Sequence, residues 1–441
     1  FDGTIVYIEE FSEAEKVQIR GALEAWAKFA DITFTEVSDS NNKDEYGDIR
    51  FVHTSNPDKS GGLAELPGAY GSEADGDVYL GSDVGYDSAS QDGGWNEFQH
   101  YAMHEIGHAL GLAHPHHGVY TIGGPTELYN ILDSTSQTVM SYDFVTGTMP
   151  GASYAYPTTP MDWDIQAIQY LYGTAEYNSG DTVYSYDSSD YVLEAIADTG
   201  GIDTIDLSNF TSLASDHTLV NLMPGEWSFI GDYQNTSPPD LQGQTALELR
   251  NIFIPDNVLI ENFIGSNFAD VIVGNDADNV LAGGDGNDVF FGGASNDTIS
   301  GGTGDDQIRG GAGNDYLDGG DGTDTATYFG ALENYTVTSN ADGSVSISGD
   351  GTHNQGTDTL INIENVRFIG GSSEDVSDDI IVPIEELIST PINQPPIADD
   401  AVTFTMAEDG TLTINEADLL GSSSDPENDA LHIENLELGA G

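Results

Sequence analysis

A repeat of nine residues between about residues 265 and 327 constrains the fold of this chain more than any other feature. Each copy approximates the pattern GGxGxDxUx, in which U is an apolar residue. The clearest copies start at Gly283, Gly292, Gly301, Gly310 and Gly319, and two degenerate copies start at Gly265 and Gly274. A disordered linker would not need an apolar side chain at every ninth position. The pattern therefore predicts short strands that stack as a parallel β-helix.

The polar positions of the repeat predict bound calcium. Glycine at positions one, two and four permits tight turns whose carbonyl groups can face a cation. Ca²⁺ takes six to eight oxygen ligands, which these carbonyls and a carboxylate at position six can supply. The expected ligands of several structural Ca²⁺ ions are Gly283, Gly292, Gly301, Gly310, Gly319, Asp270, Asp288, Asp297, Asp306, Asp315 and Asp324. Asn279 at position six and Ser295 at position four mark weaker turns.

The apolar position of the repeat predicts the core of this region. The eighth-position side chains should point inward and stack; they are Ile272, Leu281, Phe290, Ile299, Ile308, Leu317 and Ala326. Without the cation the neighbouring carboxylates would repel one another. We therefore expect a disordered repeat domain at low calcium.

A second informative segment, HEIGHALGLAH, runs from His104 to His114. His104 and His108 are four residues apart, so on a helix they share one face and can hold the same cation. Glu105 can then reach a metal-bound water instead of the metal. Gly111 lets the chain leave the helix in a left-handed conformation and bring His114 round as a third ligand. Three protein ligands leave an open position, as one catalytic zinc ion requires.

This segment matches HExxHxxGxxH, the signature of the metzincins. Met140 follows His114 by 26 residues within the sequence TVMSY, and Tyr142 stands two residues further on. The pair resembles the Met-containing turn of serralysins and astacins. The resemblance implies that Met140 forms a hydrophobic floor beneath the metal. It also implies that Tyr142 ligates zinc in the resting enzyme and swings away to hydrogen-bond the tetrahedral intermediate.

The similarity to serralysins spans roughly residues 1–370. Besides the metal motif, the similar stretches are residues 12–37, 163–173, 200–210 and 357–368. The resemblance implies an α+β metzincin catalytic domain followed by an all-β parallel β-helix domain, the RTX β-roll. The tail is longer than that of a typical serralysin, and we expect a short C-terminal β segment there. The resemblance further implies a bacterial protein exported by a type I system, unfolded inside the cell and folded by extracellular calcium.

The expected activity is the hydrolysis of peptide bonds in proteins or peptides by a secreted endopeptidase. Zinc lowers the pKa of its bound water and polarises the scissile carbonyl. Glu105 takes the water proton and later delivers it to the leaving amine. Zinc and Tyr142 stabilise the oxyanion. Residues 61–68 are a candidate edge strand for an extended substrate, with a plain connecting loop as the alternative.

Three further histidines lie near the motif. His100 precedes His104 by one turn but falls outside the signature, so we expect it in the cleft or on the surface rather than on the metal. His116 and His117 are expected in a loop.

The apolar spacing predicts helices over residues 12–30, 97–110 and 163–171, with Ser12 as an N-cap. Strands are expected over residues 32–37, 48–53 and 77–80. We expect four parts: a protease domain at 1–195, the β-roll at 196–370, an acidic linker at 371–396 and a partial cadherin-like or immunoglobulin-like module at 397–441.

The charge is extreme, because 9 Lys and Arg stand against 76 Asp and Glu, for a net charge of −67. Such a surface repels phosphates, so we expect no nucleic-acid partner. Even eight bound Ca²⁺ would neutralise only about sixteen of these charges. The remaining acidity suits a saline, marine or halophilic habitat, where salt screens the repulsion.

No cysteine is present, so disulfides and thiolate metal sites are excluded. No apolar run approaches the ~20 residues of a membrane-spanning helix. The chain does not open with a basic and then an apolar segment, so we expect that a signal or propeptide has been removed. We also expect a monomer. The alternative function is a calcium-dependent adhesin or matrix-binding protein whose protease domain is secondary or inactive.

Overall fold

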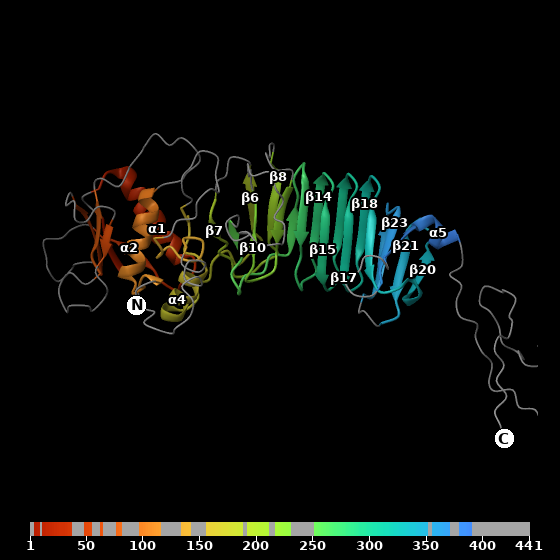
Figure 1. Ribbon diagram of the computed structural model, residues 1–441. Coiled ribbons are helices and arrows are strands. Elements are labelled where there is room, and N and C mark those ends of the chain that lie inside the picture. Colours follow the sequence, from red (N-terminus) through yellow and green to blue (C-terminus); the bar gives the residue numbers. More distant parts are fainter. Residues whose placement is uncertain are drawn as a thin grey trace, which may run out of the picture.

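The structure is a computed structural model, and it describes thirteen ranges of the chain. They are residues 4–8, 11–37, 48–54, 62–64, 76–81, 97–115, 134–142, 156–187, 192–210, 217–230, 251–351, 355–370 and 379–389. A part that contains helices and a small sheet lies at the N-terminal end, and a long stack of strands extends from it (Figure 1). This arrangement confirms an α+β region followed by an all-β region.

The N-terminal part is built on a five-stranded sheet in the order β2-β1-β3-β5-β4. Its strands are β1 (Thr4–Tyr7), β2 (Phe34–Glu36), β3 (Ile49–Thr54), β4 (Gly62–Ala64) and β5 (Val78–Gly81). Strands β1, β2, β3 and β5 pair in parallel, and β4 pairs antiparallel with β5 at one edge. Residues 62–64 therefore form the edge strand that the sequence suggested, whereas the rest of the 61–68 stretch lies outside the described residues.

Three helices of this part coincide with the predicted ones. They are α1 (Glu13–Ala27), α2 (Glu97–Ala109) and α4 (Asp162–Tyr172). The predicted N-cap is confirmed: the Glu15 amide donates to Ser12 Oγ at 3.3 Å, and the Ser12 amide donates to Glu15 Oε2 at 2.7 Å. Trp26 is fully buried in α1 and donates its indole N–H to the Met103 carbonyl of α2 at 3.0 Å. This contact fixes α2, which carries the histidine motif.

The C-terminal part consists of two parallel sheets that face each other. One has nine strands: β6 (Val183–Asp187), β8 (Thr204–Asn209), β12 (Asn262–Ile264), β14 (Val280–Asp285), β16 (Thr298–Thr303), β18 (Tyr316–Asp321), β20 (Tyr335–Ser339), β21 (Val345–Gly349) and β22 (Thr357–Ile361). The other has seven: β9 (His217–Asn221), β13 (Ala269–Val273), β15 (Val289–Ala294), β17 (Gln307–Ala312), β19 (Thr325–Phe329), β23 (Asn365–Ile369) and β24 (Ile380–Pro383). Antiparallel pairing occurs only at one end of each sheet, between β20, β21 and β22 in the first and between β23 and β24 in the second.

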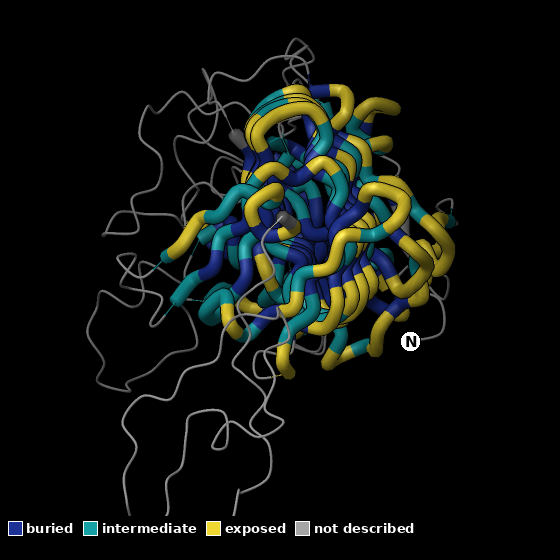
Figure 2. Tube along the Cα trace, turned by 90° about the vertical axis from the view of Figure 1, so that its right-hand side faces the viewer, coloured by how far each residue is buried: buried dark blue, intermediate teal, exposed yellow. Residues whose placement is uncertain are grey.

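Successive repeats alternate between the two sheets, so strands that pair directly are eighteen residues apart. Leu281 pairs with Ile299 in one sheet, and Phe290 pairs with Ile308 in the other. All seven eighth-position side chains are at most 1% exposed, as predicted. Viewed along the stack, the buried residues fill the centre and the exposed turns lie outside (Figure 2).

A small three-stranded sheet stands where the two parts meet. It contains β7 (Glu194–Ala195), β10 (Trp227–Ser228) and β11 (Ile252–Phe253). Leu193, Trp227 and Phe253 are buried in the same apolar cluster as the helices of the N-terminal part. The two parts therefore share a packed interface.

Two segments differ from the sequence-based expectation. Strand β6 precedes residue 196, yet it pairs with β8 and belongs to the nine-stranded sheet. Residues 380–389, within the stretch interpreted as a linker, instead form β24 and the helix α5 (Ile384–Ser389). The reason is burial, because β24 adds to the free edge of β23 and Leu387 is only 5% exposed. The cadherin-like stretch 397–441 lies outside the described residues.

Candidate metal sites

Helix α2 brings three histidines together. His104 Nε2 lies 3.0 Å from His114 Nε2, and His108 Nε2 lies 2.9 Å from the same atom. Gly111 has φ +103, and the Leu112 amide donates to the Gly107 carbonyl at 2.9 Å, so the chain turns sharply after the helix. This turn carries His114 back to the helix. In the described part of the chain, His104, His108 and His114 are the one group of three or more His, Asp or Glu side chains whose ligand atoms all lie within 4.8 Å of one another.

The outer nitrogens of two of these rings are held by backbone carbonyls. His104 Nδ1 donates to the Val139 carbonyl and His108 Nδ1 donates to the Leu112 carbonyl, each at 2.8 Å. Burial lowers the pKa of His104 well below its usual value, so its ring is neutral. The Nε2 atoms of His104 and His108 therefore present lone pairs toward His114. Three converging imidazole nitrogens fit a zinc ion with an open fourth position.

Glu105 lies next to this group and is 5% exposed. Burial raises its pKa to about 8, and a hydrogen bond from the Ala64 backbone in β4 opposes that rise. Its Oε2 atom is buried without a hydrogen-bond partner in the described structure. A nearby cation would lower this pKa again and favour the carboxylate. Glu105 can therefore hold or release a proton beside the three histidines.

Met140 and Tyr142 lie beneath and beside the histidines. Met140 is 2% exposed, and a Cβ atom added to Gly107 would meet its sulfur at 2.5 Å. Gly107 thus allows the Met140 side chain to pack directly under α2. The Tyr142 ring is half exposed and lies 5.3 Å from the His104 ring and 4.5 Å from the His114 ring, measured between centroids. It stands within reach of the space that the histidines surround.

His100 is not part of the histidine group. It is 2% exposed, its ring lies 5.2 Å from that of Tyr156, and burial lowers its pKa to about 3. The side chain is therefore a neutral, packed histidine within the fold. His116 and His117 lie outside the described residues.

Asp164 is a residue of this site that the sequence reasoning missed. It is 2% exposed and accepts hydrogen bonds from Thr138 Oγ1 at 2.6 Å and from the Val139 amide at 2.7 Å. The Val139 carbonyl in turn accepts from His104. Burial raises the pKa of Asp164 to about 6. The Asp164 carboxyl therefore links α4 to the Thr138–Val139 turn, whose Val139 carbonyl orients His104. The position of Asp164 in a helix next to Trp163 gave no sign of this role in the sequence.

The repeat turns contain carboxylates suited to calcium. Each aspartate at position six accepts a backbone amide with one oxygen, as when the Asp270 amide donates to Asp288 Oδ1 at 2.8 Å. The other oxygen, Oδ2, is buried without a partner in five of them, namely Asp288, Asp297, Asp306, Asp315 and Asp324. A buried carboxylate oxygen without a partner is costly. A hard cation held between turns would satisfy these atoms, so the residues fit calcium.

Asp270 and Asn279 differ from the other sixth-position residues. Asp270 accepts from Thr218 Oγ1 at 2.5 Å and from the Ser266 amide at 2.8 Å, so both of its oxygens have partners. Asn279 accepts from the Asn275 amide at 2.9 Å. These first turns of the stack therefore satisfy their side chains within the protein. Ser295 adopts φ +70, a conformation that favours glycine, which agrees with its interpretation as an unusual residue at position four.

A buried carboxyl group outside the repeats, that of Asp203, was also missed. Asp203 is fully buried, and its pKa rises to about 6 because of burial and the nearby charges of Asp198 and Glu261. Its Oδ2 atom has no partner within the described residues. The signal in the sequence was the GGIDTID stretch, where Gly201 precedes Asp203 by two residues, as the fourth-position glycine precedes the aspartate in the repeats.

Comparison with protein families defines the class of protein. Residues 7–120 match the matrixin family of peptidases. Residues 264–299 and 291–326 match the RTX calcium-binding nonapeptide repeat, and residues 392–441 match a cadherin-like domain. The chain thus joins a matrixin-type peptidase region, which implies a catalytic zinc, to calcium-binding repeats and a cadherin-like segment.

Among characterised proteins, the chain is similar to serralysins, so this predicted resemblance is confirmed. It is 36% identical to serralysin of Proteus mirabilis over 290 residues, which cover 60% of this chain and 54% of that protein. It is 32% identical to metallopeptidase AprA of Pseudomonas marginalis and 36% identical to serralysin C of Dickeya chrysanthemi, with the same coverage. The chain spans about half the length of these relatives.

Proposed function

We propose that this protein is a secreted zinc-dependent endopeptidase of the metzincin type, with a calcium-dependent β-roll that serves folding and secretion. The observation that carries the proposal is the convergence of three histidine nitrogens beside a buried carboxylate with a free oxygen. The similarity to serralysins supports the same activity. The proposed parts are an N-terminal protease domain, a β-roll whose nine-stranded sheet already includes β6, and the segments after residue 370.

His104, His108 and His114 would hold the metal, with Tyr142 as a further ligand in the resting enzyme. Zinc supplies a Lewis acid that polarises a carbonyl and acidifies a bound water. Glu105 takes a proton at its free Oε2 and later gives it to the leaving amine. The hydroxyl of Tyr142 donates a hydrogen bond to the developing oxyanion. Met140 supports the floor of the site by packing against Gly107.

The edge strand β4 supports the choice of a peptide substrate. It is the last strand of its sheet, so an extended peptide can pair with its outer side by β-augmentation. Ala64 of β4 also hydrogen-bonds Glu105. A peptide on this strand would therefore lie beside the carboxylate that handles the proton.

The extracellular location and type I export are part of the proposal. Among the described residues, no helix has the length and apolar character to cross a membrane. In five repeat aspartates Oδ2 has no hydrogen-bond partner in the described structure. Such carboxylates suit a domain that folds where calcium is abundant. A monomeric state, the absence of a nucleic-acid partner and a saline habitat stay predictions from the sequence.

The direct test compares casein cleavage by the wild type with cleavage by Glu105→Ala and Glu105→Gln. All three proteins are loaded with zinc and calcium, and their metal content and folding are measured. We expect both variants to lose at least ~100-fold in activity while they keep zinc, since general acid–base catalysis contributes about 10²–10⁴. Equal cleavage by the variants would disprove the catalytic role of Glu105.

The adhesin alternative is kept because residues 392–441 match a cadherin-like domain. Binding to cells or polysaccharide that persists in Glu105→Ala would support an adhesive contribution. Loss of casein cleavage in the same variant would show that the peptidase activity depends on Glu105 and that the adhesive binding does not.

A further inference from the structure

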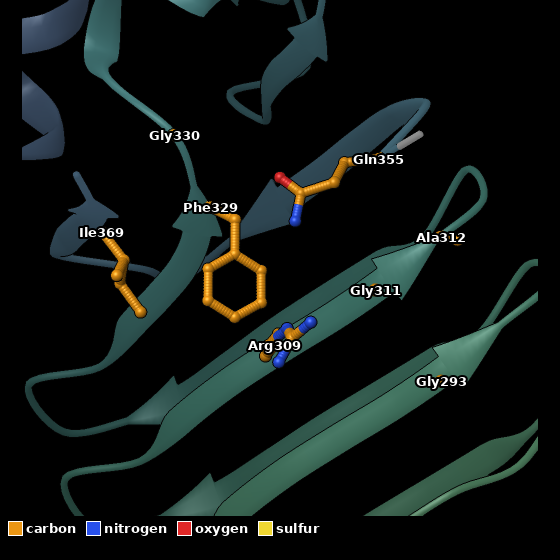
Figure 3. A pocket seen from close by; sticks show the side chains of 8 residues that line it. All are labelled: Gly293, Arg309, Gly311, Ala312, Phe329, Gly330, Gln355 and Ile369. Carbon is orange, nitrogen blue, oxygen red and sulfur yellow. The ribbon is translucent and has the colours of Figure 1, made fainter. Parts of the chain in front are cut away.

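A hollow of about 360 Å³ lies where strands β17 and β19 end in the seven-stranded sheet (Figure 3). Strand β17 lies far along the stack from α2, which carries the histidine motif (Figure 1). The hollow is lined by Gly293, Arg309, Gly311, Ala312, Phe329, Gly330, Gln355 and Ile369. None of these residues is acidic, although the chain carries 76 Asp and Glu. The local composition therefore departs sharply from that of the whole protein.

Arg309 is a cation without a carboxylate partner. Its guanidinium lies 3.9 Å above the centroid of the Phe329 ring, and burial lowers its pKa. The other arginines of the described residues each pair with a carboxylate: Arg20 with Glu36, Arg50 with Asp77 and Arg367 with Asp379. Within the described residues, no acceptor contacts the guanidinium of Arg309. Its N–H groups, which lie in the plane of the guanidinium, are therefore available to a ligand.

Gln355 supplies a second donor to the hollow. It is 5% exposed, and its Oε1 accepts the Tyr335 hydroxyl. This contact fixes the amide plane, so that Nε2 lies on the side of Phe329 and Arg309 (Figure 3). The described structure contains no acceptor for Nε2. This N–H can therefore donate to a ligand in the hollow.

The walls between these donors are apolar. Phe329 and Ile369 both line the hollow, and glycines at 293 and 311 leave its other side without side chains. Phe291 and Arg309 pair across neighbouring strands, so the apolar surface continues toward β15. A small ligand could therefore place an apolar body on Phe329 and Ile369 while a polar head meets the donors.

We propose that this hollow is a carboxylate-binding site that takes a monocarboxylate with a short apolar body. The planar guanidinium of Arg309 donates two hydrogen bonds to the carboxylate, which is the geometry that this pair favours. Gln355 Nε2 donates a third. The carboxylate belongs either to a free organic acid or to the C-terminus of a peptide. Because the hollow is separate from the histidine group, the proposal is independent of peptidase activity.

The test is an NMR titration of the full chain, loaded with calcium and zinc, with 3-phenylpropionate. Its neutral analogue 3-phenylpropionamide is the ligand control. We expect saturable binding of the acid that weakens at least tenfold in Arg309→Gln and about fivefold in Gln355→Leu. In Gln355→Leu the Tyr335 hydroxyl can donate its one proton to the neighbouring Phe329 carbonyl. Arg20→Gln removes the same charge elsewhere and should leave binding unchanged.

Two peptide arms distinguish the sources of the carboxylate. Acetyl-Ala-Ala-Leu with a free carboxyl terminus and its C-terminal amide are titrated in the Glu105→Ala background. Arg309-dependent binding of the free peptide, but not of the amide, identifies a chain terminus as a ligand; binding of 3-phenylpropionate alone identifies a free acid. Since carboxylates also bind zinc, only the Arg309-dependent part of the binding is counted. The proposal is overturned if Arg309→Gln binds every acid as the wild type does, or if amides bind as tightly as acids.

Discussion

At the scale of the residue, the candidate active site depends on the lack of a side chain at Gly62, which lies against Glu105. Gly62 lies in β4, and a Cβ atom there would stand 2.5 Å from Glu105 Oε1 and 2.7 Å from Glu105 Cγ. These distances are far shorter than any non-bonded contact allows. The edge strand can approach the carboxylate, and Ala64 can hydrogen-bond it, only because residue 62 lacks a side chain.

We predict that Gly62→Ala displaces Glu105 and lowers kcat/KM for casein at least ~100-fold, the scale of a lost general base. Zinc content should not change, because the atoms nearest the added Cβ all belong to Glu105 and none to a histidine. Gly21→Ala is the matched control: its Cβ would meet only the end of the flexible Gln99 side chain, at 3.2 Å. Normal cleavage by folded Gly62→Ala would refute the positioning role.

The histidine group could be predicted from the sequence, whereas the tertiary contacts that hold the residues around it in place could not. His104, His108 and His114 fall within eleven residues, so helix geometry and one glycine determine how they meet. The contacts of Glu105 with β4 and of Asp164 with Val139 join residues far apart in the chain. No local pattern indicates such contacts, since they depend on how the sheet and α4 pack.

At the scale of the element, the repeat turns depend on glycine for more than backbone freedom. Gly304 has φ +133, and a Cβ atom there would lie 1.7 Å from the Gly286 carbonyl oxygen of the turn below. Turns eighteen residues apart therefore touch backbone to backbone. The turn glycines are needed for the spacing of the stack itself.

We predict that Gly304→Ala destabilises the calcium-loaded β-roll by about 3 kcal/mol or more, because it combines backbone strain with a clash against backbone. The control is Gly343→Ala. Gly343 also has positive φ, +96, but a Cβ atom there meets nothing within 4 Å, so its cost is about 1–2 kcal/mol. Thermal unfolding followed by circular dichroism measures both. Equal losses would mean that the close approach of the turns contributes nothing.

The elements of the β-roll were largely predictable because one pattern determines both turn and core. The repeat does not indicate where the stack ends. Strand β24 and helix α5 arise from an acidic stretch that composition assigned to a linker, yet Ile380–Pro383 pair with β23 and Leu387 is buried. The acidic average composition of this stretch gave no indication of the short apolar strand β24, whose partner β23 lies in the preceding domain.

At the scale of the whole molecule, the calcium-free protein must accommodate a row of buried carboxyl groups. Burial raises the pKa of Asp288 to about 8, of Asp297 to about 7 and of Asp306 to about 6. An unfolded aspartate has a pKa near 3.9. Between pH ~4 and ~8 the folded, calcium-free state therefore binds more protons than the unfolded state does, so its stability falls as pH rises.

Calcium should reverse this dependence, because Ca²⁺ and protons compete for the same carboxylates. We predict that the calcium-free protein loses part of its β-structure between pH 5.5 and pH 8, and that its midpoint of thermal unfolding is roughly 5 °C or more lower at pH 8. The calcium-saturated protein should be less stable at pH 5.5 than at pH 8. Circular dichroism melts at both pH values, with chelator or with excess calcium, measure all four midpoints. If chelated protein keeps full β-structure at pH 8, or if both forms respond to pH in the same direction, the buried aspartates are not the groups that make this fold depend on calcium.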